Sequence, residues 1–565
     1  MTKNISEAIF LTDNINYGKH MKNNIFFKSL VTIGIFLINI TFSTIVYSDN
    51  SNANNANTSV SALNNNLSQL LADAGFTGKI ESTLTTKLGR PINTKLANIG
   101  QSLFFDSILS LANDNSCSGC HSPLTGFGDT QSISIGVENN GIVGAGRKGP
   151  RNQRRSLKVL NSAFYPSLMW NSRFTSISHN PFDVSEGVRV PFFLGGTTVW
   201  KPNAPSIYGT SFDNQITTSL LAVHGSLPPT ELIEVAGFAV DDPANLDDRL
   251  YSPTHLTSSG LTSDTVPTAI AGPNGSDIDS TDRSYAIRAK ILDRMNSNAN
   301  YVGLFSSIFP SASNGNITFA QIAAAIAEFE FTLTFADAPI DQFARGNVNA
   351  LTTSQKRGAV LFFGKANCVA CHSTAGESQE MFSDFQTHAV GIPQIAPASF
   401  GLKSGGDPQN PNDFQGDYEF SGPNKDEDYG REELTGDPVD RYAFRTAPLR
   451  NISVQPTFFH NGAFTNLSDA LKYHLNTLSA AAKYDPATAG LASDLTVRTG
   501  PIEPVLKRLD SRIVAMGNLN LSSQEFNDLY NFLNGGLLDN GALPNNLTSL
   551  IPKTLPSGRK VLNFQ

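Results

Sequence analysis

The spacing of apolar residues along the chain predicts a protein built mainly from α-helices. Between Ile317 and Leu333 apolar residues recur every three or four positions, which is the period of one face of a helix. A second helix is predicted after the capping box Ser522-Ser-Gln-Glu525, and Gly535 is expected to end it. Strand-like alternation is rare and loops are long, as in the aperiodic segment 175–222. The expected fold class is therefore mainly α.

The N-terminal segment combines positive charge with a long apolar run. Several lysines precede the run, which extends from Ser29 to Tyr47 and is followed by residues suited to signal cleavage. This is the layout of a secretory signal peptide, here residues 1–48. The run is also long enough to span a bilayer, so an uncleaved anchor that tethers the protein through residues 29–47 stays open. In both cases we expect the rest of the chain to lie in the periplasm.

A short repeat divides the chain into two parts. Gly100-Gln-Ser-Leu-Phe-Phe105 precedes the first pair of cysteines, and Gly358-Ala-Val-Leu-Phe-Phe363 precedes the second. In each copy the glycine leaves room for another helix to approach closely. The repeat predicts two domains of common plan, residues 76–345 and residues 346–545. The Asn/Ser-rich segment 49–75 is expected to be a disordered linker, and residues 546–565 a C-terminal tail.

All four cysteines fall in two Cys-x-x-Cys-His motifs. The first runs from Cys117 through Cys120 to His121, and the second from Cys368 through Cys371 to His372. This motif is the attachment signature of c-type haem: two thiols add to the two vinyl groups of one haem, and the adjacent histidine ligates its iron. The sequence therefore predicts two covalently bound haems c.

Three other uses of the cysteines compete with haem attachment. Two Cys-x-x-Cys pairs can form one zinc site with four thiolate ligands, but such a site has no need of a histidine after each pair. A disulfide framework is not expected in so long a chain with so few cysteines. A thioredoxin-like redox pair would need one motif near a βαβ pattern, which the sequence lacks.

Composition limits the partners of the protein. Charged residues make up 16% of the chain and the formal net charge is −8. Nucleic acid is not an expected partner, because phosphate binding needs clustered lysine and arginine.

The ordered segments around the two motifs resemble the bacterial dihaem cytochrome c peroxidase family, which includes MauG-type enzymes that oxidise side chains of a partner protein. The resemblance covers roughly residues 85–540. The segments that carry it are Leu103-Phe-Phe-Asp106, Gly149-Pro-Arg-Asn152, Leu160-Asn-Ser-Ala-Phe164, Pro166-Ser-Leu-Met-Trp-Asn171, Phe382-Ser-Asp-Phe385, His388-Ala-Val-Gly-Ile-Pro393, Arg445-Thr-Ala-Pro-Leu-Arg-Asn451 and Pro456-Thr-Phe-Phe-His-Asn-Gly462.

The resemblance implies two cytochrome c-like domains with different roles. The haem held by His121 would be the site where hydrogen peroxide is reduced. The haem held by His372 would be six-coordinate and would pass on electrons from a redox partner protein, such as a small cytochrome or a copper protein. Trp170 matches the tryptophan that lies between the haems in the family and would relay electrons. A buried core tryptophan is the alternative.

The family also places a glutamate above the peroxide-binding iron, where it moves a proton from one peroxide oxygen to the other. The segment from Pro228 to Gly237 resembles this region and makes Glu234 the acid–base group, with Glu231 as the competing choice. His224 stands where the family has glutamine. It would either hydrogen-bond to bound peroxide or ligate the iron in a resting form.

The second haem departs further from the family. Classical members use a methionine as the sixth ligand of that iron, just before the segment that begins at Arg445, but this chain has no methionine there. Tyr442 is the expected ligand in its place, as a tyrosine is in MauG, although Ala443 is the aligned residue if the register shifts by one. A phenolate would lower the reduction potential relative to methionine. A core tyrosine is the alternative.

The resemblance further implies a calcium ion between the haems. Asn152 is the candidate side-chain ligand, and the carbonyl ligands would fall near residues 421–425. His388 and His460 are expected to hydrogen-bond around the second haem. Three functions remain open: a peroxidase supplied with electrons by a small protein, a MauG-like enzyme that oxidises a partner protein, and a non-enzymatic electron carrier with two six-coordinate irons.

Overall fold

Helices and long loops make up most of the computed structural model, which describes residues 53–192, 196–200, 218–237, 280–397 and 420–565. The predicted signal peptide or anchor (residues 1–48) lies outside these ranges, as does much of the segment 175–222. Within the described ranges no helix is both long enough and apolar enough to cross a membrane. Residues 54–565 form one compact unit, so the predicted division into two domains stays a prediction.

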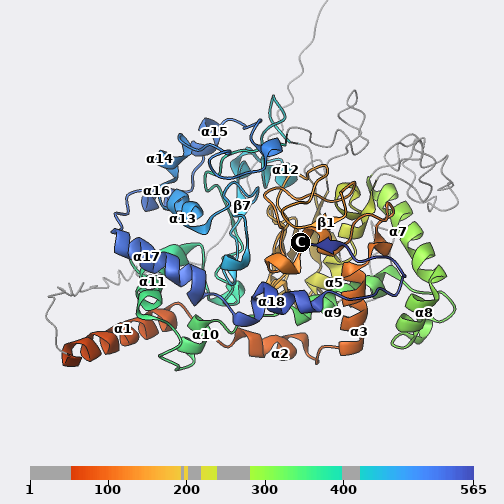
Figure 1. Ribbon diagram of the computed structural model, residues 1–565, viewed down its shortest axis with the longest axis horizontal. Coiled ribbons are helices and arrows are strands. Elements are labelled where there is room, and N and C mark those ends of the chain that lie inside the picture. The colour runs from red at the N-terminus through yellow and green to blue at the C-terminus, as the bar shows by residue number, and fades with distance from the viewer. Residues whose placement is uncertain (1–52, 193–195, 201–217, 238–279, 398–419) are drawn as a thin grey trace, which may run out of the picture. The chain divides into compact units, whose positions relative to one another are not determined.

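The helices confirm the mainly helical expectation (Figure 1). Their bounds are α1 Ala53–Asp73, α2 Leu84–Leu88, α3 Thr94–Phe105, α4 Cys117–Cys120, α5 Leu220–His224, α7 Ser280–Ser297, α8 Ala299–Ser306, α9 Phe319–Thr332, α10 Pro339–Ala344, α11 Thr353–Phe363, α12 Glu432–Thr435, α13 Leu467–Leu475, α14 Thr477–Ala481, α15 Glu503–Leu506, α16 Ser511–Met516, α17 Ser523–Asn531 and α18 Pro544–Leu547.

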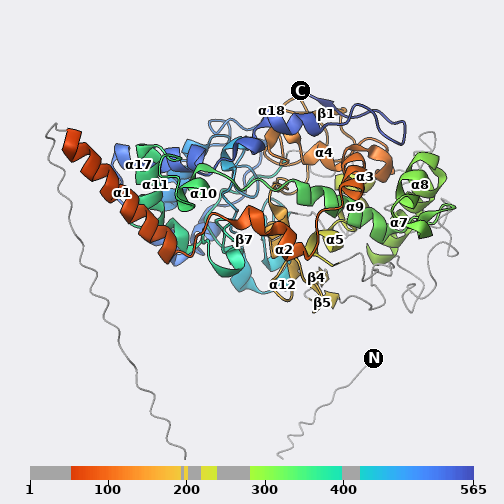
Figure 2. The same ribbon diagram turned by 90° about the horizontal axis from the view of Figure 1, so that it is seen from below.

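Two helix pairs reproduce the sequence repeat. Helix α3 packs against α9, and α11 packs against α17; both pairs can be followed in Figures 1 and 2. The contact is closest at the two repeated glycines. A Cβ atom on Gly100 would lie 1.8 Å from the carbonyl oxygen of Ala325, and one on Gly358 would lie 2.0 Å from that of Asp528. The expectation that these glycines admit a neighbouring helix is confirmed.

Local signals also set the ends of these helices. The capping box predicted before α17 is present, because the Ser522 hydroxyl accepts from the backbone N–H of Glu525 and the Glu525 carboxylate accepts from that of Ser522. Helix α9 begins with a similar reciprocal pair, Thr318 and Gln321. Each pair satisfies backbone donors that the first turn of a helix leaves without partners.

Among the described residues, strands are short and lie in three small sheets. An antiparallel sheet has the order β2-β3-β4-β5, β1 pairs in parallel with β8, and β6 pairs antiparallel with β7. Their bounds are β1 Ile142–Val143, β2 Ser167–Leu168, β3 Phe174–Ser176, β4 Val188–Phe192, β5 Gly196–Trp200, β6 Thr387–His388, β7 Phe444–Arg445 and β8 Asn563–Phe564. Four of these strands, β2 to β5, thus lie within or next to the segment 175–222, which shows no periodicity in the sequence.

The segment predicted to be a disordered linker, residues 49–75, is instead largely the helix α1. That prediction is wrong for Ala53–Asp73. The physical reason is that Leu67 and Leu71, one helical turn apart, are buried in the core that surrounds α11 and α17. Burial of two leucines stabilises the helix by a few kcal/mol, about 1.5–3 for each side chain. Several polar residues of this helix are exposed: Ser59, Ser61, Asn65, Asn66 and Ser68.

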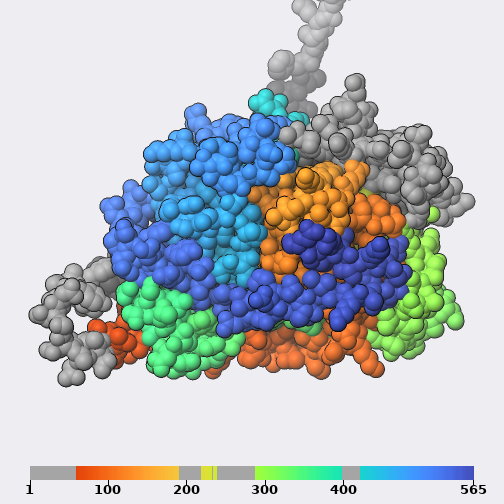
Figure 3. All heavy atoms as spheres, viewed as in Figure 1, coloured from red at the N-terminus to blue at the C-terminus, as the bar shows by residue number. Residues whose placement is uncertain are grey.

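The C-terminal tail returns to the first part of the chain. Residues of β8 pair with β1, and the ring of Phe564 lies 5.9 Å from that of Phe105 in α3. Leu547 and Leu555 are buried in the same aromatic cluster. Figure 3 shows the C-terminal residues (dark blue) lying against residues near the first cysteine motif (orange). The last residues of the chain therefore contribute to the core around that motif.

Candidate functional site

The first cysteine motif opens onto a cavity of about 170 Å³. Cys117 and Cys120 lie on the single turn of α4, His121 follows directly, and all three residues line the cavity. The Nδ1–H group of His121 donates to the backbone carbonyl oxygen of Leu157 at 2.8 Å. That bond fixes the tautomer and leaves Nε2 as the atom available to a metal.

The second motif repeats this arrangement around a cavity of about 290 Å³. Cys368 and Cys371 lie on a 3₁₀ turn, and the Nδ1–H group of His372 donates to the backbone carbonyl oxygen of Phe382 at 3.0 Å. Phe362 of α11 lies 6.4 Å from the His372 ring, just as Phe104 of α3 lies 6.4 Å from the His121 ring. Each cavity therefore offers two thiols, one oriented imidazole and an aromatic wall.

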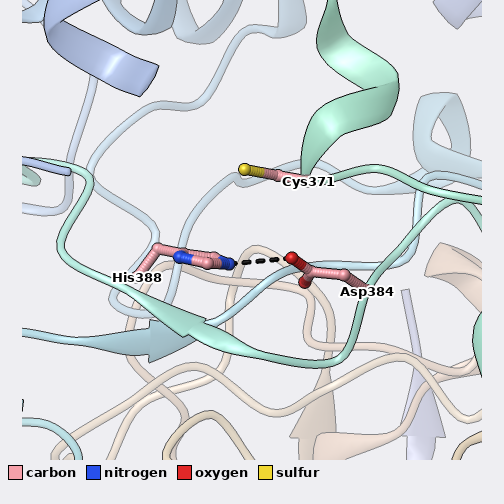
Figure 4. Close-up of side chains that lie close together, drawn as sticks. All are labelled: Cys371, Asp384 and His388. Carbon is pink, nitrogen blue, oxygen red and sulfur yellow. Dashed lines mark hydrogen bonds and ion pairs between the residues drawn. The ribbon is translucent and has the colours of Figure 1, made fainter. Parts of the chain in front are cut away.

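The competing uses of the cysteines find little support in this geometry. All four thiols are unpaired, and the two motifs line different cavities. Among the described residues the one cluster of three potential metal ligands is Cys371, Asp384 and His388 (Figure 4). Its sulfur belongs to the second motif, so a thioether bond to haem would take it away from a metal ion. A zinc site with four thiolates would need the two motifs together.

His388 has both of its ring nitrogens engaged. Nε2 lies 2.9 Å from the Asp384 carboxylate and Nδ1 lies 3.0 Å from that of Asp510. Arg512 also approaches Nδ1, at 2.8 Å. His388 lines the second cavity, as expected for a residue that hydrogen-bonds beside the haem, but it has no nitrogen left for an iron.

The first cavity brings together two of the predicted catalytic residues. Glu234 lies on a π-turn, residues 232–236, and His224 is the last residue of α5; both line the cavity that His121 lines. Burial, and then the nearby His121 and Arg173, lower the pKa of His224 to about 3, so its imidazole is neutral. The Nε2 atom of His224 is buried and has no hydrogen-bond partner among the described residues.

Backbone contacts hold the Glu234 turn in place. The side chain of Asn115, which lies two residues before the first motif, donates to the Glu234 carbonyl oxygen at 2.6 Å. A Cβ atom on Gly136 would lie 1.9 Å from the carbonyl oxygen of Ile233, so only glycine allows this approach. Glu231, the competing choice, instead forms an ion pair with Arg173 at 3.4 Å and does not line the cavity.

Trp170 is buried between the two cavities and lines both. Its indole N–H donates to the backbone carbonyl oxygen of Arg155 at 2.8 Å, and its own carbonyl oxygen accepts from the backbone N–H of Arg445 at 2.6 Å. These bonds fix the ring in one orientation. The geometry agrees with the position that the family resemblance implies for this residue.

Three basic side chains, Arg155, Lys158 and Arg445, also line both cavities and are buried. Burial lowers the pKa of Lys158 to about 7 and those of Arg155 and Arg445 to about 10. None of the three forms an ion pair with a carboxylate in the described ranges, and Nη1 of Arg445 is buried without a partner. Buried cations of this kind need anions, and the two propionate groups that every haem carries would supply them. The residues therefore fit haem.

Asn152, the candidate calcium ligand, lines the first cavity. Its Nδ2 donates to the Ser134 hydroxyl at 2.8 Å, while its Oδ1 is buried without a hydrogen-bond partner among the described residues. An amide oxygen in that state is available to a cation or another donor.

The structure does not bring Tyr442 to the second cavity. Its side chain is buried elsewhere, and its hydroxyl donates to the Glu427 carboxylate at 2.5 Å. Burial, followed by this carboxylate, raises the pKa of Tyr442, which opposes formation of the phenolate that would ligate iron. The geometry does not support the expectation that Tyr442 is a haem ligand. The reason is local: the left-handed backbone at Tyr442 (φ 61°) turns the residue toward Tyr429 and Glu427.

Sequence reasoning missed other residues of the two cavities. Glu330, near the end of α9, lines the first cavity, and burial raises its pKa to about 8. The second cavity is lined by His474 and Met516, in addition to His460, which was expected beside the second haem. Burial, followed by the nearby His372, lowers the pKa of His474 to about 4. The available signal for His474 was its place on the apolar face that Leu467 and Leu471 define.

Comparisons with known proteins agree with the motifs. Residues 94–349 match the family described as di-haem cytochrome c peroxidase. Cytochrome-c peroxidase IdrP1 of Pseudomonas sp. (strain SCT) is 24% identical over 394 residues, which cover 68% of this chain and 73% of that protein. Methylamine utilization protein MauG of Methylophilus methylotrophus is 22% identical over 398 residues, which cover 70% of this chain and 77% of that protein.

Among solved structures, a MauG-like protein associated with microbial copper homeostasis aligns with a TM-score of 0.47 at 21% identity, covering 80% of this chain and 92% of that one. The paired haem-attachment motifs, the matched family region and the relatives that align over two thirds of the chain lead to one conclusion. The chain is similar to the cytochrome c peroxidases and MauG proteins, and its residues 94–349 match the di-haem cytochrome c peroxidase family.

Proposed function

We propose that this protein is an exported dihaem oxidoreductase that reduces hydrogen peroxide at the His121 haem with electrons delivered through the His372 haem. The observation that carries the proposal is that Glu234 and His224 line the same cavity as the first haem-attachment motif. When bound, the haems supply peroxide binding and the storage and transfer of electrons.

Glu234 and His224 perform the proton chemistry in this proposal. Reduction of peroxide to two water molecules needs two electrons and two protons, and one proton must move between the two peroxide oxygens as the O–O bond breaks. The Glu234 carboxylate would accept this proton from one oxygen and return it to the other, which leaves as water. His224, neutral and with Nε2 unpaired, orients the peroxide by a hydrogen bond. The Asn115 side chain, which donates to the Glu234 carbonyl oxygen, and the close approach of Gly136 to Ile233 hold Glu234 in position for this task.

Trp170 serves as the electron relay between the two halves. Its indole lines both cavities and is fixed at its N–H and at its backbone. If haem occupies both cavities, an aromatic ring that lines both would divide one long electron-transfer step into two shorter ones. The three buried basic residues beside it would neutralise haem propionates. A calcium ion held partly by the free Oδ1 of Asn152 would add to this bridge.

A peroxidase is favoured over a MauG-like enzyme acting on a partner protein. Two features of the sequence favour the MauG-like function, Tyr442 as an iron ligand and the long insertion 175–222, and the first loses its support because Tyr442 donates to Glu427. Electrons would then come from a small soluble redox protein in the periplasm. The apolar segment 29–47 would direct export and, if uncleaved, would tether the enzyme to the membrane.

Replacing Glu234 by glutamine tests this function. The Glu234→Gln variant keeps the size and shape of the side chain but cannot accept a proton, so peroxide turnover by the purified holoprotein should fall by about 10²–10⁴-fold. Glu231→Gln, three residues away and outside the cavity, is the matched control and should stay within a few-fold of the parent. Equal turnover in both variants would contradict the assignment of Glu234.

A further inference from the structure

Helix α13, Leu467–Leu475, directs a histidine into the second cavity. Leu467, Leu471 and His474 are spaced four and three residues apart, so they share one face of the helix. All three residues line the cavity. Asn466 caps the helix by accepting from the backbone N–H groups of Ser468 and Asp469, which fixes where this face begins.

The distance between His474 and His372 matches two ligands of one iron. Their ring centroids are 6.4 Å apart and the ring planes cross at 64°. Two imidazoles that bind a metal from opposite faces, each through a bond of about 2.0 Å, have ring centroids roughly 6 Å apart. His372 is already oriented by its bond to the Phe382 carbonyl oxygen, so its Nε2 faces the cavity.

The other side chains that could ligate this iron are less well placed. His388 is held between two carboxylates, and the His460 ring lies flat on Phe444, with centroids 3.5 Å apart and planes at 7°. Tyr442 donates to Glu427 outside the cavity. Met516 lines the cavity and is the remaining competitor. Nδ1 of His474 and Nε2 of His460 are both buried with no hydrogen-bond partner among the described residues, but Nε2 of His460 lies 3.8 Å from the Asp428 carboxylate.

We propose that His474 is the sixth ligand of the second haem, opposite His372. The second haem then has two imidazole ligands in place of the histidine–methionine or histidine–tyrosine pairs that the family resemblance implies. Two imidazoles leave no open position, so peroxide reacts only in the first cavity. They also stabilise ferric iron more than methionine does, which lowers the reduction potential. The proposal needs only haem attachment at Cys368 and Cys371, and it stands whether or not the first haem reduces peroxide.

Spectroscopy of the ferric holoprotein tests the ligand directly. The spectra are recorded in a His224→Ala background, which removes any second imidazole from the first haem. Electron paramagnetic resonance and near-infrared magnetic circular dichroism should then show a low-spin haem with two imidazoles. His474→Ala should abolish this signal, and His474→Met should replace it by the charge-transfer band of methionine-ligated ferric haem and raise the reduction potential.

Tyr442→Phe and Met516→Leu are the matched controls and should leave the low-spin signal unchanged. A haem count of two per chain and an unchanged far-ultraviolet circular dichroism spectrum show that each variant has folded. Survival of the signal in His474→Ala, or its loss in either control variant, overturns the assignment. If no His474 variant folds, the parent spectrum decides: a methionine or phenolate signature overturns the proposal, and a bis-imidazole signature supports it.

Discussion

Replacing Gly358 by alanine tests whether the close contact between α11 and α17 stabilises the region around the second haem. A Cβ atom at this position would lie 2.0 Å from the Asp528 carbonyl oxygen and 2.7 Å from the Phe532 Cβ, whereas ordinary contacts begin at 3.4 Å. The helices would have to separate by more than an ångström. Overpacking costs about 1–3 kcal/mol, and this clash lies at the upper end of that range because the Asp528 carbonyl oxygen and the Phe532 Cβ cannot rotate away. The better helix propensity of alanine offsets about 1 kcal/mol, which leaves a net loss of about 2 kcal/mol.

Gly303→Ala is the matched control. Gly303 lies inside α8, and a Cβ atom there would have nothing within 4 Å. This variant gains the helix propensity without the steric cost, so its stability should rise by up to about 1 kcal/mol. The two alanine variants thus differ in the sign of their effect, although the chemical change is the same.

Urea unfolding of the holoprotein, followed by far-ultraviolet circular dichroism, measures the difference. The unfolding midpoint of Gly358→Ala should fall below that of the parent, and that of Gly303→Ala should equal or exceed it. A parent-like midpoint for Gly358→Ala would refute the reasoning, because it would mean that α11 and α17 do not touch as closely as the structure has them.

Three further predictions follow from buried groups. Trp170→Phe should slow peroxide turnover with a protein electron donor while the optical spectra of both haems stay unchanged; parent-like turnover would remove the tryptophan from the relay. Burial raises the pKa of Asp129 to about 6. The protonated Asp129 carboxyl therefore stabilises the folded state below the pKa that this group has in the unfolded chain. This contribution to the free energy of unfolding, about 3 kcal/mol, is lost as the pH rises through 6. Asp129→Asn should abolish this fall in thermal melts recorded between pH 4.5 and 7.5, and an unchanged slope would contradict it. Asp341 holds the buried Arg450 guanidinium through two bonds of 2.7 and 2.8 Å. Asp341→Asn should cost about 3–5 kcal/mol in a denaturant titration, whereas a loss below 1 kcal/mol would show that the pair is not buried.

Features of the sequence that act locally were predictable. The two haem-attachment motifs, the capping box before α17, and the glycines at positions 100 and 358 each depend on residues within one or two helical turns. Such features can be predicted because the haem-attaching thiols, the helix cap and the absent Cβ atom act through residues close to them in the sequence. The resemblance to the family pointed to Glu234 and Trp170, which line the cavity of the first motif and both cavities respectively, while their roles stay predictions.

Features that depend on distant partners were not predictable. The helix α1 was missed because its composition is that of a linker, and only burial of Leu67 and Leu71 beneath a distant part of the chain makes it fold. Tyr442 stands near the family's ligand in sequence, but its contact with Glu427 depends on a loop that the sequence pattern does not place. His474 lies 102 residues after His372, and only the packing of α13 over the second cavity brings the two rings together.

The number of haems bound to each chain tests the central claim most directly. A pyridine haemochrome assay on the purified exported protein should give two haems c for each polypeptide. A variant that carries both Cys368→Ala and Cys371→Ala should give one, held at the first motif. A parent count of zero or one, or haem that organic solvent extracts from the protein, would contradict the account.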